Sequence, residues 1–143
     1  PGTGVVQMTL AQNAALTGSI IVTTPQNVAL ADARRGKTMF DKLQVPVVGI
    51  VENMSNFVCP ACGHVEPIFN VGGGKNYAEQ CGLPFLGAIP LEPAVREAGD
   101  GGQPVVLAAS ESRSAEAFRD LAAQVARQAS IQALTPAEPA AAG

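Results

Sequence analysis

Three short apolar runs separated by helical patterns constrain the fold of this chain most strongly. Residues 19–24, 47–51 and 85–90 are each dominated by aliphatic side chains, which is typical of strands buried on both faces. Between the first two runs, apolar residues recur at spacings of four and three from Ala29 to Leu43, the period of one helix face. Strands that alternate with helices predict an α/β fold with a mainly parallel sheet and helices on both faces.

Weaker signals place the remaining elements. We expect a helix-compatible stretch before residue 17, a short helix over 75–81 closed by Gly82, a helical turn over 92–98 and a last helix over about 112–130. Residues 131–143 are rich in Ala and Pro, and we expect a disordered tail there. The sequence therefore predicts one folded unit over 1–130.

Composition limits the classes of partner. The 143 residues suit one domain, and a net charge of −3 without a Lys/Arg cluster argues against nucleic acid or an anionic membrane as partner. The apolar runs are shorter than the roughly 20 residues of a membrane span. Three cysteines without an export signal indicate a reducing, cytoplasmic compartment. Because the first residue is Pro1 rather than Met, we expect a piece of a longer protein.

Cys59 and Cys62 form a Cys-x-x-Cys motif after the second apolar run, in a metal loop that we expect to extend over 54–74. Two thiolates on one turn are half of a four-coordinate site for zinc or for an iron–sulfur cluster. The residues alone leave four interpretations open. They are a zinc site completed within the chain by His64 and Cys81, a thioredoxin-like redox pair, a metal or cluster that bridges two subunits, and a pair with no chemical role.

Two further motifs lie near the carboxyl ends of predicted strands, where ligands bind in parallel sheets. Asn53 ends the second strand, and its carboxamide matches the donor and acceptor of a purine edge; an Asx turn or a cap is an equal alternative. Residues 72–75, Gly-Gly-Gly-Lys, resemble a phosphate-binding helix start. They lack the G-x-x-x-x-G-K-[ST] spacing, so a flexible return loop is favoured.

Taken in order, these segments resemble the C-terminal half of the Mrp/ApbC family. Its members are P-loop ATPases that carry iron–sulfur clusters and are related to MinD and the nitrogenase iron protein. The motifs span residues 1 to about 107, and they are Pro1-Gly2-Thr3-Gly4, Ile21-Val22-Thr23-Thr24-Pro25-Gln26 with Asp32-Ala33-Arg34, Gly49-Ile50-Val51-Glu52-Asn53-Met54-Ser55, Cys59-Pro60-Ala61-Cys62-Gly63, Gly72-Gly73-Gly74, and Pro84-Phe85-Leu86-Gly87-Ala88-Ile89-Pro90-Leu91.

The resemblance implies the C-terminal part of a MinD-like P-loop NTPase fold. Cys59 and Cys62 would supply half the ligands of a [4Fe–4S] cluster that a homodimer shares through its cysteine loops and hands to apo iron–sulfur proteins. Asn53 would read the adenine of ATP, bound with Mg in the intact protein, and Pro90 would line the base pocket. Residues 1–4 would be the tail of the switch segment that senses the γ-phosphate.

The chain departs from the family pattern in two ways. Val5 stands where the family usually has Asp after the switch tail. The phosphate loop would lie upstream of Pro1, so we assign no catalytic residue and expect no ATP hydrolysis by this chain alone. The missing strands would leave an exposed sheet edge that invites pairing with another chain. The alternative function is a zinc-binding, non-catalytic module that acts in assembly or interaction.

Overall fold

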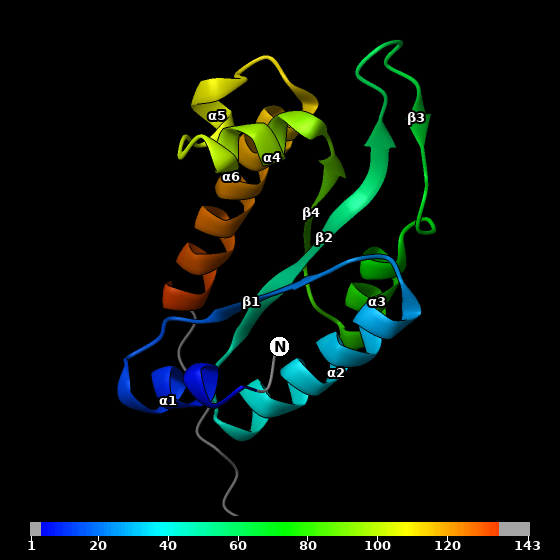
Figure 1. The fold of residues 1–143 in the computed structure, drawn as a ribbon. Coiled ribbons are helices and arrows are strands. Elements are labelled where there is room, and N and C mark those ends of the chain that lie inside the picture. Colours follow the sequence, from blue (N-terminus) through cyan, green and yellow to red (C-terminus); the bar gives the residue numbers. More distant parts are fainter. Residues whose placement is uncertain (1–3, 135–143) are drawn as a thin grey trace, which may run out of the picture.

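The computed structural model describes residues 4–134. The start of the predicted switch tail, residues 1–3, and the predicted tail over 135–143 lie outside the described residues. Helices and strands alternate along the chain (Figure 1), in the order α1 (Val5–Asn13), β1 (Ser19–Thr23), α2 (Asn27–Lys42), β2 (Val47–Val58), β3 (Val65–Glu66), α3 (Gly73–Cys81), β4 (Phe85–Leu91), α4 (Pro93–Asp100), α5 (Val105–Ala108) and α6 (Arg113–Leu134).

The long strand β2 is the centre of the sheet. It pairs in parallel with β1 and with β4, and Ile50 lies opposite Ile21 of β1 and Phe85 of β4. Near its end, Phe57 has Leu91 of β4 as one partner and Glu66 of the antiparallel strand β3 as the other. The short strand β3 therefore extends the sheet beyond the end of β1. A mostly parallel sheet is what the sequence predicts.

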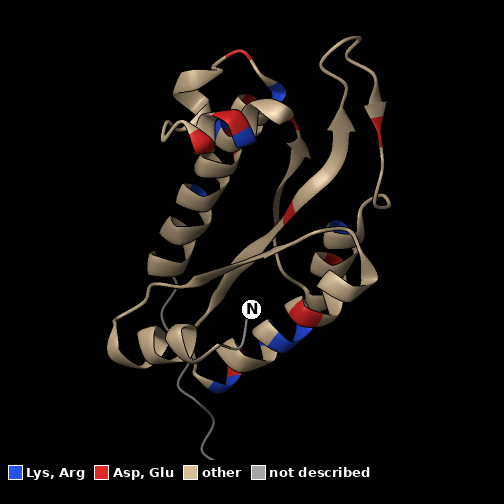
Figure 2. Ribbon diagram, in the orientation of Figure 1, with Lys and Arg blue, Asp and Glu red and all other residues tan. Residues whose placement is uncertain are grey.

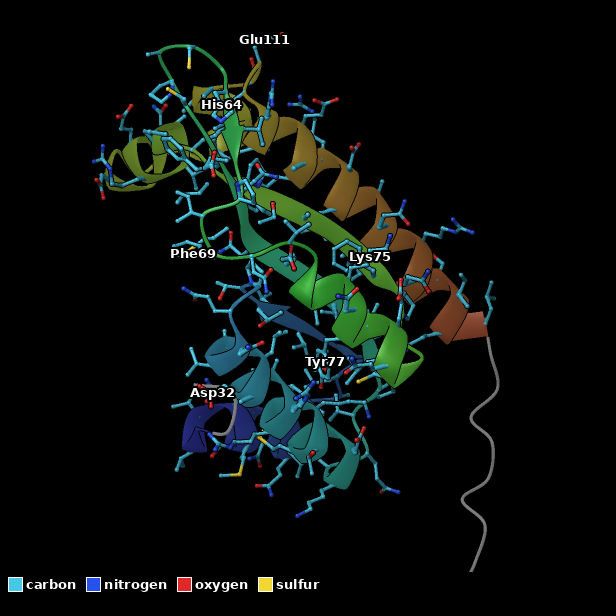
Figure 3. The ribbon with its side chains drawn as sticks, turned by 90° about the vertical axis from the view of Figure 1, so that its right-hand side faces the viewer. Asp32, His64, Phe69, Lys75, Tyr77 and Glu111 are labelled. Carbon is cyan, nitrogen blue, oxygen red and sulfur yellow. The ribbon has the colours of Figure 1, made fainter. Side chains whose placement is uncertain are left out.

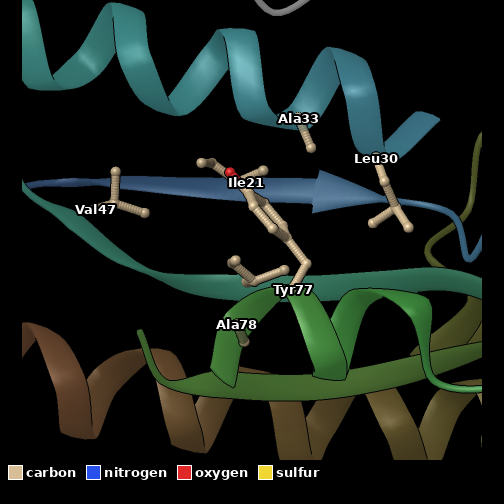
Figure 4. Close-up of a cluster of buried hydrophobic side chains, with 7 residues drawn as sticks. Ile21, Leu30, Ala33, Val47, Tyr77 and Ala78 are labelled. Atoms are coloured by element: carbon tan, nitrogen blue, oxygen red, sulfur yellow. The ribbon is translucent and has the colours of Figure 1, made fainter. Parts of the chain in front are cut away.

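Helices cover both faces of this sheet, as predicted. On one face, α2 and α3 enclose a cluster centred on the fully buried Ile50 (Figure 4), whose other members are Ile21, Leu30, Ala33, Val47, Tyr77 and Ala78. On the other face, α6 packs Phe118 and Leu121 against Val51 of β2 and against Leu86 and Ile89 of β4. Successive residues of β2 point to opposite faces, so one strand supplies both cores.

The strand β2 is longer than the sequence predicts. Residues 54–58, expected to begin the metal loop over 54–74, belong to β2, and β3 also lies within that predicted loop. The register between β2 and β4 shifts after Asn53, Met54 adopts a positive φ of 54°, and pairing resumes at Phe57. The hydroxyl of Ser55 donates to the carbonyl of Ile89 across this irregularity. Contacts with neighbouring strands therefore keep in the sheet a polar segment whose sequence is typical of a loop.

The helices also differ from their predicted bounds. The short helix α3 starts at Gly73 rather than at residue 75, and its end is closed by Gly82 in the left-handed region, as expected. The last helix α6 continues to Leu134, so residues 131–134, predicted as the start of a tail, are helical. Among residues 4–134, no helix has the length and apolar character needed to cross a membrane.

The strand β1 has an open side. Within residues 4–134 it pairs with β2 alone. Its residues Ile20 and Val22 point to the face that α6 covers over β2 and β4, and Val22 is 61% exposed. The structure thus contains the exposed sheet edge that the sequence predicts.

Candidate functional site

Cys59 and Cys62 lie at the tip of a projecting hairpin. We call residues 57–72 the cysteine arm; it comprises the end of β2, the tip over 59–64, β3 and a return segment to α3. The arm reaches past the ends of β1 and β4 in Figure 1, and its tip carries no Lys, Arg, Asp or Glu (Figure 2). Neither cysteine forms a disulfide, and Cys62 is exposed.

Backbone hydrogen bonds shape the tip. The N–H of Cys59 donates to the carbonyl of His64 at 2.9 Å, and the N–H of Gly63 donates to the carbonyl of Cys59 at 2.8 Å. Gly63 has a φ of 70°, a conformation that costs any residue with a Cβ. The glycine directly after the second cysteine is therefore needed for the turn that brings the two thiols together.

The same turn favours the thiolate form of Cys59. Hydrogen bonds from the backbone N–H groups of Cys62 and then Ala61, with a smaller contribution from the Cys62 side chain, hold the pKa of the Cys59 thiol below its usual value. The thiolate is the form that ligates metals and acts as a nucleophile. The tip thus prepares one sulfur for ligation without a neighbouring positive charge.

The other two residues of the predicted single-chain zinc site do not join the pair. His64 is paired with Glu66, Nε2 to Oε2 at 3.1 Å, and Figure 3 shows His64 on the arm. Cys81 lies at the end of α3 and packs against the core cluster beside Tyr77. Burial, followed by a hydrogen bond with Cys81, raises the pKa of the Tyr77 hydroxyl. Among residues 4–134, no three Cys, His, Asp or Glu side chains are grouped as metal ligands.

Asn53 stands where β2 leaves the packed sheet. Its Oδ1 accepts a hydrogen bond from the N–H of Met54 at 2.9 Å. This bond reaches the next residue, whereas the Asx turn that the sequence left as an alternative to purine recognition reaches the residue two positions on. The side chain also lines a hollow of about 440 Å³ beside β1, together with Thr24 and Asp32. One carboxamide group therefore stabilises the bend and still faces open space.

Pro90 lies one register step beyond the partner of Asn53, because Asn53 pairs with Ile89. Pro90 lines a second hollow of about 350 Å³, between β4 and the start of α6, with Ser55 and Arg113. The two predicted base-binding residues thus share one edge of the sheet but face separate hollows. Cys59 is six residues beyond Asn53, just past the end of β2, a separation of about 20 Å for a fully extended chain.

The structure accounts in other ways for the phosphate-like motif at residues 72–75 and for a Gly-Lys-Thr run at residues 36–38. The N–H of Gly74, in the first turn of α3, donates to the buried carboxylate of Glu52 at 2.6 Å, so a side chain of the protein occupies this helix start, beside which Figure 3 labels Lys75. Residues 36–38, Gly-Lys-Thr, lie inside α2, where Lys37 pairs with Asp41 at 2.8 Å. Sequence reasoning missed Glu52, although an acidic residue within an apolar run was a visible signal.

Comparison with known proteins shows the family to which the chain belongs. The sequence pattern of the ParA family, described as NUBPL iron-transfer P-loop NTPase, matches residues 1–126. An iron–sulfur cluster carrier protein of Salmonella typhimurium is 51% identical over 128 residues, which are 90% of this chain and 35% of that protein. The chain therefore spans about a third of the length of this relative.

Two solved structures share the fold. The nucleotide-binding protein of Archaeoglobus fulgidus, in complex with ADP, superposes with a TM-score of 0.64 and 34% identity over 73% of this chain and 43% of that one. The cell division ATPase MinD of Pyrococcus furiosus gives a TM-score of 0.60 and 25% identity over 78% of this chain and 43% of that one. These likenesses confirm the predicted MinD-like α/β fold.

Proposed function

Because the chain belongs to the ParA/NUBPL family of iron-transfer P-loop NTPases, we propose that it carries an iron–sulfur cluster on Cys59 and Cys62 and passes it to apoproteins. The observation that carries the proposal is the arm tip, where two cysteines that form no disulfide share one hydrogen-bonded turn and Cys62 is exposed. The relative from Salmonella typhimurium is named an iron–sulfur cluster carrier protein. The cluster is cargo here.

A second copy of the chain completes the ligand set in this proposal. A [4Fe–4S] cluster takes four thiolates, whereas the arm offers two, and no third ligand groups with them in the part of the chain that the structure describes. Two arms related by a two-fold axis would supply four equivalent positions. The uncharged tip supports this arrangement, because two tips can approach without repulsion between like charges.

Transfer of the cluster is an exchange of ligands. A thiolate of the client replaces Cys59 or Cys62 on an iron atom, and the released sulfur takes up a proton or stays a thiolate. Thiolate exchange needs ligands that an incoming sulfur can reach. The exposed position of Cys62 on a projecting arm meets this requirement.

Nucleotide binding belongs to the longer protein in this proposal. The ADP complex of the Archaeoglobus fulgidus protein supports a base site at the carboxyl edge of the sheet. Asn53 Oδ1 is engaged by Met54, so its Nδ2 would donate to a base in the hollow beside β1. Pro90 faces the separate hollow at the start of α6, so it would contact the ring only where the base reaches across the sheet edge that the two residues share. The G-x-x-x-x-G-K-[ST] loop does not occur in these 143 residues, and ATP with Mg would require a loop supplied by further sequence.

Anaerobic reconstitution with ferrous iron and sulfide tests the proposal. The wild-type protein should acquire charge-transfer absorbance and about two iron atoms per protomer, and it should sediment as a dimer when loaded. The double variant Cys59→Ser, Cys62→Ser should lose both properties, whereas Cys81→Ser, the matched control, should keep them. Equal iron in the double variant contradicts the proposal, as does stoichiometric zinc without iron uptake, which is the outcome expected of the zinc-binding module.

A further inference from the structure

Glu52 is a buried acidic residue that the proposed function leaves unused. Glu52 lies on β2 directly before Asn53, and the residue is only 3% exposed to solvent. Burying a carboxyl group is unfavourable unless a donor compensates it. The compensating donor is the N–H of Gly74, 22 residues later in the sequence, at 2.6 Å from Oε2.

The first turn of α3 is fitted closely around this contact. A Cβ added at Gly74 would lie 3.0 Å from the Cβ of Glu52, and one added at Gly73 would lie 2.6 Å from the carbonyl oxygen of Pro25. Both glycines therefore let the helix start approach the backbone of β2 and the end of β1. These close contacts, with Glu52 on one side and Pro25 on the other, fix the start of α3, where the chain returns from the cysteine arm.

This contact lies at the base of the cysteine arm. The arm leaves the body through β2 and returns through residues 67–72 to Gly73. Its entry is fixed by pairing with β4, as at Phe57 and Leu91. Its return is fixed where Glu52 binds the N-terminus of α3, whose backbone dipoles and N–H groups favour a carboxylate.

We propose that Glu52 is a positioning residue, which anchors the return of the cysteine arm and so restrains the Cys59–Cys62 tip relative to the sheet. Because Glu52 adjoins Asn53, the anchor is one residue from the predicted base-reading position. The anchoring role rests on the contacts above, and its effect on a cluster rests on the proposed function.

The chain offers a matched control in Glu92. Its Oε2 accepts a hydrogen bond from the N–H of Ser114 at the start of α6, also at 2.6 Å and also 22 residues apart. The two carboxylates thus make the same kind of contact with two different helices. Only the helix held by Glu52 follows the cysteine arm.

Residue-resolved hydrogen exchange of the full-length apoprotein tests the anchor. In Glu52→Ala, the amides of Ile68 and Asn76, which bond to the carbonyls of Glu66 and Gly72, should exchange about fivefold faster, the effect of losing one such bond. Glu52→Gln, which keeps an acceptor oxygen, should recover part of the protection. Glu92→Ala should leave both amides unchanged and accelerate exchange at the start of α6. Equal exchange of Ile68 in the Glu52 and Glu92 variants would overturn the inference.

A second measurement separates this inference from the proposed function. In loaded protein, Glu52→Ala should broaden the electron paramagnetic resonance signal of the reduced cluster and speed cluster loss to a chelator several-fold, with no such change in Glu92→Ala. If wild type takes up no cluster, the proposed function fails, yet hydrogen exchange still decides the role of Glu52. If Glu52→Ala does not fold, Gly74→Ala displaces the same contact and keeps the carboxylate, and unchanged exchange at Ile68 in that variant contradicts the anchor.

Discussion

Cys59 receives its reactivity from backbone groups rather than from a charged neighbour. The N–H groups of Cys62 and Ala61 lower the pKa of its thiol, and they are held in place because Gly63 adopts a positive φ. Such a device works without lysine or arginine, which the tip does not contain. The lowered pKa of Cys59 therefore depends on the folded turn, since an unfolded chain offers no aligned N–H groups.

This dependence predicts the pH profile of alkylation. A lowered pKa means a larger thiolate fraction at any pH below the ordinary value for cysteine, so Cys59 should react with iodoacetamide at lower pH when the protein is folded. In urea the profile of Cys59 should shift to higher pH, because the backbone donors are lost. Site-resolved mass spectrometry of wild-type protein reports this directly. An identical profile in folded and unfolded protein would contradict the role given to the backbone donors.

The helix α6 is the element that completes the second face of the sheet. Leu86 of β4 is buried beneath it and is in contact with the cluster formed by Val51 and Ile89. The remainder of α6 is mostly exposed, so the stability of the helix depends on this single stripe of contacts.

Leu86→Ala should therefore lower the free energy of unfolding by about 2–5 kcal/mol, because it leaves a cavity between β4 and α6. Leu107→Ala, at a residue that is 76% exposed on α5, should change it by less than about 0.5 kcal/mol. Urea titration followed by circular dichroism measures both. A similar loss in the two variants would show that α6 does not depend on the Leu86 contact.

Elements with one clear pattern could be predicted from the sequence, and elements set by distant partners could not. The apolar runs of β1 and β4 and the helical spacing of α2 were sufficient for those three elements. The stretch from Asn53 to Asn56 remains strand between two residues that pair with β4, Asn53 and Phe57, and no local pattern records that pairing. The glycines before α3 suggested a phosphate site or a free loop, whereas the partner is Glu52, 22 residues away.

The sequence predicts how the candidate residues are placed relative to one another, but it does not predict the backbone groups that surround them. Cys59 and Cys62 share one turn, and Asn53 and Pro90 share one sheet edge, as expected. The surroundings of these side chains cannot be predicted from residue types. They depend on the backbone N–H groups of the tip and on the hydrogen bond from the N–H of Met54 to Asn53 Oδ1. Such contacts are decided by backbone conformation, which includes two positive φ angles, at Met54 and Gly63.

For the molecule as a whole, we expect the open side of β1 to promote association between chains. Strand edges and exposed apolar faces promote pairing between chains. Val22 of β1 is 61% exposed. In the sequence it is distant from the cysteine arm, where the proposed contact between subunits lies.

Val22→Lys should thus reduce concentration-dependent self-association of the 143-residue chain while leaving its melting temperature nearly unchanged. Leu107→Lys, which adds the same charge at a more exposed position on α5, should leave self-association as it is. Static light scattering of the apoprotein over a concentration series distinguishes the two. If both variants reduce association equally, net charge rather than the β1 edge is responsible.

The bend at Met54 divides the continuous strand β2 into two segments. One segment lies in the core at Ile50, the bend is at the residue with φ of 54°, and the other segment leads to the cysteines. Five residues of extended chain separate Met54 from Cys59, about 16 Å. A rotation of about 5° at the bend would move the sulfur of Cys59 by roughly 1.4 Å over that length, more than half the length of a zinc–sulfur bond of about 2.3 Å. Pairing of Phe57 with Leu91 and Glu66 beyond the bend resists such a rotation, so the outer part of the sheet holds the cysteines still on the scale of a metal–ligand bond.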